Sequence, residues 1–265
     1  MSGAQPVALV TGAGRGIGRA IAERLAGDGM AVALAARSLD QLEEVAAGIA
    51  ASGGRAQVVR CDVSSPEAVN QAVAQVIDTL GVPSVLVNNA GNSGPMGPIG
   101  LVDPMQWWNT QEIHLRGSLL MMSALIPAMV ASGGGRIVNI CSQAGTFVTP
   151  NYSSYSVAKC ALIRLTEHVD AERRAEGVRA FAIQPGTILT DIAEDAMASP
   201  DARRWAAPLV DLLVTITPEA SEAAMRHLQE SVSRMARGLW DDRAGRYLDV
   251  EQESLPPLPQ GQAPR

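Results

Sequence analysis

Tyr155 and Lys159 are the residues whose types and spacing most directly indicate chemistry. They stand four positions apart in a strongly helical segment, so their side chains share one face. A phenol has a pKa of about 10, which suits acid–base work at neutral pH poorly, whereas a nearby ammonium stabilises the phenolate and lowers that pKa. The pair therefore predicts an acid–base centre, and the alternative is an ordinary exposed i,i+4 pair.

Lys159 is also the only lysine of the chain, because the 21 basic residues comprise 20 arginines and this one. Arginine is a permanently charged planar fork, and lysine is a compact donor on a flexible stem. A lone lysine in an arginine-rich chain is consistent with a position that arginine cannot fill, and also with chance.

Ser142 follows a predicted strand at residues 137–140 and precedes Tyr155 by 13 positions. Its hydroxyl is suited to donate a hydrogen bond to a carbonyl oxygen and to polarise it. The alternative is a turn serine at a strand end. A hydrolase is disfavoured, because the residues around Ser142 lack the G-x-S-x-G elbow of serine hydrolases.

A glycine-rich loop follows the first predicted strand, with the spacing Thr11-Gly12-x-x-x-Gly16-x-Gly18. Glycines let a backbone approach a pyrophosphate closely, and the N-terminus of the following helix favours its negative charge. A strand–loop–helix context at the start of an α/β chain favours nucleotide binding over a merely flexible turn. A P-loop is excluded because no Gly-Lys-Ser/Thr occurs.

The end of the second predicted strand bears on the choice of nucleotide. An acidic residue there would hold a ribose 2′-hydroxyl, and an arginine would accommodate a 2′-phosphate. Ala36 stands at the acidic position, Arg37 follows it, and Arg15 lies in the glycine loop. NADP(H) is therefore favoured over NAD(H), unless both arginines are only solvated. Asp62 is a candidate acceptor for the adenine amino group, or else a helix cap.

Short apolar runs alternate with helix-like segments along the chain, and this pattern is typical of a parallel sheet covered on both faces. We predict an α/β fold, a single doubly wound Rossmann-like domain over residues 1–250, and a Pro- and Gln-rich tail over residues 251–265. Residues 185–218 look irregular. The predicted strands are 7–10, 31–35, 57–60, 85–87, 137–140, 178–183 and 247–250, and the helices run from the glycine loop to 28, then 40–51, 66–80, 104–131, 153–175 and 218–237.

The composition narrows the class of protein. The net charge is −6 without a basic stripe, so no nucleic-acid partner is expected. The first residues do not resemble a signal peptide and no run of 18 apolar residues occurs, so we expect a cytoplasmic protein without a membrane partner. Three cysteines, and histidines without partner spacing, predict neither a disulfide framework nor a metal site.

Taken together, several motifs resemble the short-chain dehydrogenase/reductase family. They are Thr11–Gly18, Asn88-Asn89-Ala90-Gly91, Ser142, Tyr155-Ser156-Val157-Ala158-Lys159, and Pro185-Gly186 with Thr190. The resemblance spans residues 7–191 in order and spacing. It implies hydride transfer between NAD(P)(H) and a small-molecule ketone or secondary alcohol. It also implies a homodimer or homotetramer formed through helices at residues 115–131 and 153–175.

The resemblance assigns roles to individual residues. Tyr155 would be the general acid/base, Lys159 would hold the nicotinamide ribose and lower the pKa of Tyr155, and Ser142 would orient the carbonyl or alcohol. With the residues argued above, the expected cofactor-binding set is Thr11, Gly12, Arg15, Gly16, Ile17, Gly18, Arg37, Asp62, Val63, Asn89, Ala90, Gly91, Tyr155, Lys159, Pro185, Gly186, Ile188 and Thr190.

His114 departs from the family pattern, because members usually carry an asparagine there that supports a water in the proton relay to the lysine. Either ring nitrogen of histidine can donate or accept, so the relay can survive, and the ring can also titrate near neutral pH. The alternative is a histidine packed in a helix. His114 thus joins Ser142, Tyr155 and Lys159 as a candidate catalytic residue.

Residues 191–218 match no motif. An apolar lid and simple core packing are equally open for Met197, Trp205, Leu209 and Leu213, and further pocket candidates from strand-end loops are Met96, Phe147 and Thr149. Two other functions stay open: an NAD-dependent alcohol dehydrogenase of the same fold, and a catalytically silent nucleotide-binding regulator. The intact Ser/Tyr/Lys set argues against the regulator.

Overall fold

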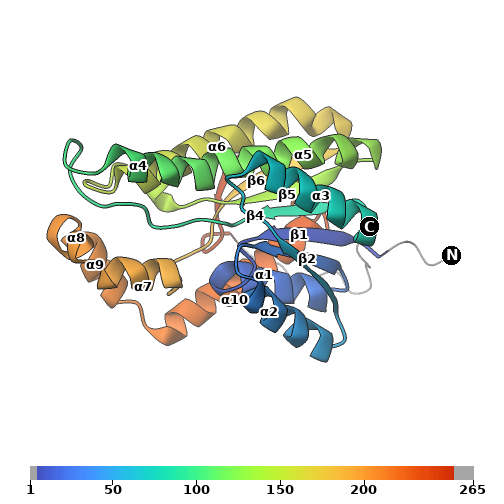
Figure 1. Ribbon diagram of the computed structural model, residues 1–265, viewed down its shortest axis with the longest axis horizontal. Helices are drawn as coiled ribbons and strands as arrows, with labels where there is room; N and C mark the ends of the chain where they lie inside the picture. The colour runs from blue at the N-terminus through green and yellow to red at the C-terminus, as the bar shows by residue number, and fades with distance from the viewer. Residues whose placement is uncertain (1–4, 254–265) are drawn as a thin grey trace.

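The computed structural model describes residues 5–253. A seven-stranded sheet runs through the molecule in the order β3-β2-β1-β4-β5-β6-β7, and every neighbouring pair is parallel (Figure 1). This doubly wound arrangement confirms the predicted fold class. The strands are β1 (Val7–Thr11), β2 (Ala31–Ala36), β3 (Arg55–Arg60), β4 (Val85–Asn88), β5 (Gly135–Ile140), β6 (Val178–Gln184) and β7 (Tyr247–Asp249).

Helices cover both faces of the sheet, three on each side (Figure 1). On one face α1 (Gly16–Gly27), α2 (Leu39–Ala51) and α10 (Pro218–Ala236) pack, and on the other α3 (Pro66–Leu80), α5 (Gly117–Ala131) and α6 (Ser153–Arg173). Successive strand residues point to opposite faces, so Ala8 and Val10 join the first cluster while Val7 and Leu9 join the second. Continuous apolar strands are thus buried on both sides.

The predicted helices and strands agree with the structure to within two residues at their ends, with two differences. The predicted helix 104–131 is α4 (Pro104–Gln111) and α5 joined by a π-helical turn at Glu112–Arg116. The segment expected to be irregular forms three short helices, α7 (Asp191–Ala198), α8 (Pro200–Trp205) and α9 (Ala207–Val214). We call residues 191–214 the lid.

Local capping explains these short helices. The Thr190 hydroxyl accepts from the Ala193 amide and the Ser199 hydroxyl from the Ala202 amide, and Pro200 stands at the first position of α8. Caps of this kind satisfy amides that a short helix otherwise leaves unpaired. The capping residues were readable in the sequence, but their helices are too short to show a clear apolar period. Most of the predicted tail, residues 254–265, lies outside the described residues.

The helical stretch Pro104–Ala131 is long and apolar enough to cross a membrane, judged by length and composition only. That criterion is weak, because core helices of other proteins also meet it. In this structure Met121, Leu125 and Met129 are fully buried against the sheet.

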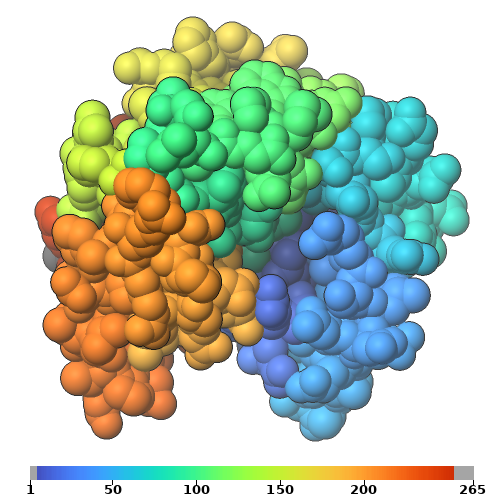
Figure 2. Space-filling view, turned by 60° about the vertical axis from the view of Figure 1, so that its left-hand side comes forward, coloured from blue at the N-terminus to red at the C-terminus, as the bar shows by residue number. Residues whose placement is uncertain are grey.

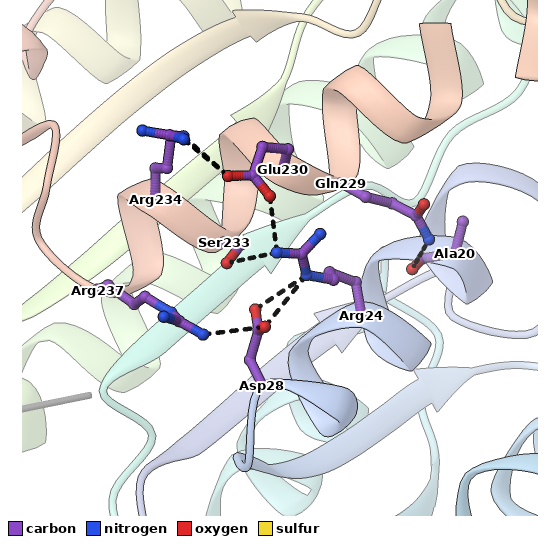
Figure 3. Close-up of polar contacts among 8 residues, drawn as sticks. All are labelled: Ala20, Arg24, Asp28, Gln229, Glu230, Ser233, Arg234 and Arg237. Atoms are coloured by element: carbon purple, nitrogen blue, oxygen red, sulfur yellow. Dashed lines mark hydrogen bonds and ion pairs between the residues drawn. The ribbon is translucent and has the colours of Figure 1, made fainter. Parts of the chain in front are cut away.

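A partly buried network of ion pairs joins α1 to α10 (Figure 3). One carboxylate oxygen of Glu230 lies 2.8 Å from the Arg24 guanidinium and the other 2.9 Å from that of Arg234. Asp28 pairs with Arg24 at 3.2 Å and with Arg237 at 3.1 Å. Because three arginines share two carboxylates, each carboxylate is needed to keep its guanidinium partners paired. The network fixes the helix that follows the glycine loop against the C-terminal part of the chain.

We predict that Glu230→Gln lowers the free energy of unfolding by about 1–3 kcal/mol, because it removes the charge shared by Arg24 and the buried Arg234. Urea unfolding measures this change. The matched control is Glu222→Gln on the same helix, whose side chain is 73% exposed in its pair with Arg226 and should cost less than about 0.5 kcal/mol. Equal effects of the two variants would contradict the structural role of the network.

Candidate active site

A hollow of about 380 Å³ lies at the carboxyl edge of the sheet, where β1, β2, β3 and β4 end. Figure 2 shows the molecule hollowed between its blue N-terminal part and the orange lid. This edge is where ligands bind in doubly wound sheets. We call this hollow the nucleotide pocket. Its predicted lining residues are Gly12, Arg15, Gly16, Ile17, Arg37, Asp62, Val63, Asn89, Ala90, Gly91 and Thr190.

The start of α1 carries the features that a pyrophosphate requires. Its N-cap residue Arg15 makes no side-chain hydrogen bond to the first-turn amides, and that turn holds no acidic residue. Gly12 and Gly16 have φ angles of +63° and +53°, a region that favours glycine. Unpaired amides at the start of a helix form an anion site, so these residues fit a dinucleotide.

Two residues expected to bind cofactor, Thr11 and Gly18, hold the loop in place. The Thr11 hydroxyl accepts from the amides of Asn89 and Ala90 at 3.0 and 3.2 Å, and it donates to the Val87 carbonyl oxygen. A Cβ on Gly18 would lie 2.2 Å from the Gly12 carbonyl oxygen. Neither residue lines the nucleotide pocket. Both residues therefore pack the loop, and their direct contact with a cofactor stays a prediction.

Charge in the nucleotide pocket is mixed. Ala36, Arg37 and Ser38 line the end of β2, and within the described residues Arg37 has no ion-pair partner. Arg15 pairs at 3.3 Å with Asp191, the first residue of the lid. The carboxylate of Asp62 accepts from the amide and hydroxyl of Ser64, which lowers its pKa. Ser65, and not Asp62, caps the start of α3. Asp62 therefore stays at the nucleotide pocket with one of its carboxylate oxygens hydrogen-bonded.

A second hollow of about 380 Å³ brings Ser142, Tyr155, Lys159 and His114 together, and we call it the catalytic pocket. It shares Ile17, Asn89, Thr190 and Ile192 with the nucleotide pocket, so the two are continuous. Pro185, Gly186 and Ile188 also line it, as expected. The four candidate catalytic residues come from the turn after β5, from α6 and from the π-helical turn, and only the tertiary fold makes them neighbours.

A buried chain of hydrogen bonds fixes α6 to the sheet beneath these residues. The Asn88 amide donates to the Asn139 amide oxygen at 2.8 Å, and the Asn139 amide nitrogen donates to the Thr166 hydroxyl at 2.8 Å. These residues belong to β4, β5 and α6. The Lys159 ammonium adds a further hydrogen bond between α6 and the sheet by donating to the Ile140 carbonyl oxygen at 2.6 Å. Such a fully buried network favours a single orientation of the helix.

Burial is the largest influence on the pKa values of Tyr155 and Lys159. It raises the pKa of Tyr155 to about 12, against an opposing hydrogen bond from Ser142. It lowers the pKa of the Lys159 ammonium to about 8. The Lys159 nitrogen lies 5.4 Å from the centre of the Tyr155 ring. The expected lowering of the phenol pKa by this ammonium is thus not the net effect in this structure, because desolvation of the phenolate outweighs it.

His114 is held by the backbone of Asn92. Its Nε2 lies 2.8 Å from the Asn92 carbonyl oxygen and 3.1 Å from the amide nitrogen, and its ring meets the Tyr155 ring edge-on at 5.3 Å. The shorter contact favours Nε2–H as donor, which leaves Nδ1 as a buried acceptor without a protein partner. The π-helical turn, with its extra residue, aims this side chain into the pocket.

The surroundings of His114 disfavour the possibility that its ring titrates near neutral pH. Burial, with the nearby charge of Lys159, lowers its pKa to about 3. The ring fills the space beside Gly91, where an added Cβ would lie 2.3 Å from the His114 Cε1. His114 is therefore both a packed core residue and a neutral wall of the catalytic pocket.

Some of the remaining candidate lid and pocket residues line the catalytic pocket, and others do not. Phe147, Thr149, Leu209 and Leu213 line the catalytic pocket, whereas Met197 and Trp205 do not. Met96 packs under the lid with Tyr152. Sequence reasoning missed Tyr152, whose ring stacks on Tyr155 with centroids 4.9 Å apart; their i,i+3 spacing was the available signal.

Among residues 5–253, no group of three or more His, Cys, Asp or Glu is placed to hold a metal.

Comparison with known proteins identifies the family. The model of the short chain dehydrogenase family matches residues 6–201. The chain is 37% identical over 219 residues to the short chain dehydrogenase citE of Monascus ruber, covering 80% of this chain and 75% of that protein. It is 38% identical over 197 residues to a 3-oxoacyl-acyl-carrier-protein reductase of Synechocystis sp., covering 73% and 78%.

Similarity to a solved structure supports the same family. The structure of 7 alpha-hydroxysteroid dehydrogenase complexed with NADH and a 7-oxo bile acid superposes with a TM-score of 0.78 at 26% identity, covering 93% of this chain and 92% of that one. The chain therefore belongs to the short-chain dehydrogenase/reductase family, a family of oxidoreductases that use NAD(P).

We predict that folding stability falls as the pH is lowered from 6.5 towards 3, because His114 has a pKa of about 3 when folded against 6.5 when unfolded. In that range the unfolded chain binds the additional proton, so stability rises with pH by on the order of a few kcal/mol in total. His114→Asn should flatten this dependence in urea unfolding.

The control for this prediction is His168→Asn, which replaces a histidine whose side chain is 66% exposed. Its pH dependence of stability is measured beside that of His114→Asn. A wild-type slope that survives in His114→Asn would show that other groups carry it.

Proposed function

We propose that the protein reduces a ketone with NADPH, and catalyses the reverse oxidation of the corresponding secondary alcohol. One observation carries the proposal: Ser142, Tyr155 and Lys159 meet in a pocket that is continuous with the nucleotide pocket. A bound nicotinamide supplies the hydride that adds to the carbonyl carbon. All the remaining chemistry, which is proton delivery and orientation, falls to side chains of this chain.

Tyr155 is the proton donor in this proposal. Its pKa of about 12 keeps the phenol protonated at neutral pH, as the reduction direction requires, because the carbonyl oxygen takes a proton while the carbon takes the hydride. The Ser142 hydroxyl donates a hydrogen bond to the same oxygen and stabilises its developing charge. Lys159 orients the nicotinamide ribose, and its ammonium favours the phenolate left after proton transfer.

His114 takes the place of the relay asparagine in this proposal. Because its pKa of about 3 keeps it neutral, it cannot serve as a cationic acid. Its free Nδ1 is positioned to accept a hydrogen bond from a water that passes protons to Lys159.

The preference for NADP(H) rests on Arg37. It lines the nucleotide pocket at the end of β2, beside Ala36, where a carboxylate for a 2′-hydroxyl is missing. An arginine suits a 2′-phosphate through charge and bidentate geometry. Arg15 adds positive charge, although its pair with Asp191 reduces its contribution.

NAD-dependent oxidation of an alcohol is the second candidate. The observation in its favour is that a structurally similar 7 alpha-hydroxysteroid dehydrogenase was solved with NADH. The carboxylates of Asp62 and Asp191 also line the nucleotide pocket and would repel an added phosphate. Comparison of the two cofactors decides between the candidates.

We predict that Tyr155→Phe lowers kcat for ketone reduction by about 10²–10⁴-fold, the usual contribution of a positioned acid. The decrease in NADPH absorbance with a panel of ketones measures it. The matched control is Tyr247→Phe, because Tyr247 does not line the catalytic pocket and its buried hydroxyl has no hydrogen-bond partner among the described residues. This variant should keep normal turnover. Near-normal turnover of Tyr155→Phe would remove Tyr155 from the mechanism.

We also predict that Arg37→Ala lowers kcat/KM for NADPH by about 10–100-fold, the effect of losing a charge-assisted hydrogen bond, and leaves that for NADH nearly unchanged. Arg55→Ala is the control, because Arg55 begins β3 and the nucleotide pocket lies where that strand ends. It should change neither value. If Arg37→Ala affects both cofactors equally, or neither, the argument for NADP(H) is wrong.

A further inference from the structure

The lid side of the catalytic pocket is apolar. Ala193 and Ala196 of α7 and Leu209, Leu212 and Leu213 of α9 face it, and Phe147 lines the opposite side. Leu212 and Phe147 are 57% and 55% exposed, so large apolar surfaces border this pocket without being covered by the chain itself. A ligand with an apolar body would cover them, which is a favourable exchange for both surfaces.

Charged side chains are almost absent from the same lining. Among the described residues that line the catalytic pocket there is no arginine, aspartate or glutamate, and Lys159 is the only charged group. Its ammonium is buried and already donates to the Ile140 carbonyl oxygen. His114 is neutral. An anionic group on the substrate would therefore lose water in this pocket without gaining an ion-pair partner.

The lid carries a net negative charge. Residues 191–214 include five acidic side chains, Asp191, Glu194, Asp195, Asp201 and Asp211, and two basic ones, Arg203 and Arg204, a sum of −3. The acidic excess extends over α7, α8 and α9, and α7 and α9 also contribute apolar residues to the lining of the catalytic pocket; we call these three helices the acidic wall. The field of this wall repels carboxylates and phosphates and leaves neutral molecules unaffected.

We infer that the site takes an uncharged ketone or secondary alcohol with an apolar, ring-sized body, and discriminates against ketones that carry a carboxylate or phosphate. The inference rests on the proposed function, since it names the substrate class for the same hydride transfer. The selection combines apolar contact with the lid, the lack of a free cation in the pocket and the acidic wall around it. Substrates attached to phosphate-bearing carriers are disfavoured for the same reasons.

Two probes of nearly the same shape test the effect of charge on the substrate. The methyl ester of para-acetylbenzoate and the free para-acetylbenzoate anion carry the same ketone and ring. We expect kcat/KM for the ester to exceed that for the anion by at least about 100-fold. Acetone, which is uncharged but lacks the ring, tests the apolar body and should also be a poor substrate. An anion that matches or exceeds the ester would overturn the inference, and so would acetone that matches the ester.

Leu212→Arg ties the discrimination to the lid. This exposed residue of α9 lines the pocket, so the variant should fold and place a cation beside the substrate. We expect kcat/KM for the anion to rise at least about tenfold relative to the ester. Leu101→Arg is the control, because Leu101 is 70% exposed and lines neither the catalytic nor the nucleotide pocket. It should leave the ratio unchanged, and an equal shift in both variants would contradict a local effect of the lid.

Binding separates this inference from the proposed function. Calorimetric titration of the Tyr155→Phe variant saturated with NADP⁺ should give tighter binding of the ester than of the anion. If neither probe is reduced but the ester still binds more tightly, the proposed function fails and the selectivity stands. If the anion binds as tightly as the ester, the selectivity fails even where turnover is normal.

Discussion

The buried hydrogen-bond chain from Asn88 through Asn139 to Thr166 is the interaction on which the arrangement of the site depends. It links β4, β5 and α6 within an apolar interior and so favours one register of the helix against the strands. Lys159 adds a separate hydrogen bond from α6 to the last carbonyl oxygen of β5. The same contacts that stabilise the core therefore set the positions of Ser142 and Tyr155, whose chemistry needs them on one side of a ligand.

Burial then determines the protonation states. Desolvation acts in the same sense on every titratable group of the pocket, by favouring its neutral form: it raises the pKa of Tyr155 and lowers the pKa values of Lys159 and His114. A pocket whose only charged lining group among the described residues is the buried Lys159 suits an uncharged ligand, and its apolar lid agrees with that chemistry. Polar groups are concentrated in the neighbouring nucleotide pocket, which the start of α1, Arg15 and Arg37 line.

Membership of the family accounts for the architecture and for the arrangement of Ser142, Tyr155 and Lys159, while His114 and the lid give this chain its own character. His114 lies in the π-helical turn and its ring occupies the space that a Cβ on Gly91 would need. The lid combines short capped helices with apolar and acidic residues, and its part beyond the matched residues 6–201 contributes Leu209, Leu212 and Leu213 to the lining of the catalytic pocket.

The sequence by itself determined the alternation of strands and helices, because the apolar periods of continuous strands and amphipathic helices are local. It also indicated the glycine loop, Ser142 and the Tyr155–Lys159 pair, since spacing alone brings residues to strand ends and helix faces. Only the tertiary structure showed that Thr11 and Gly18 support the loop, that His114 is neutral, and that Tyr152 stacks on Tyr155. These properties depend on burial and on contacts between distant segments, which no local pattern of residues contains.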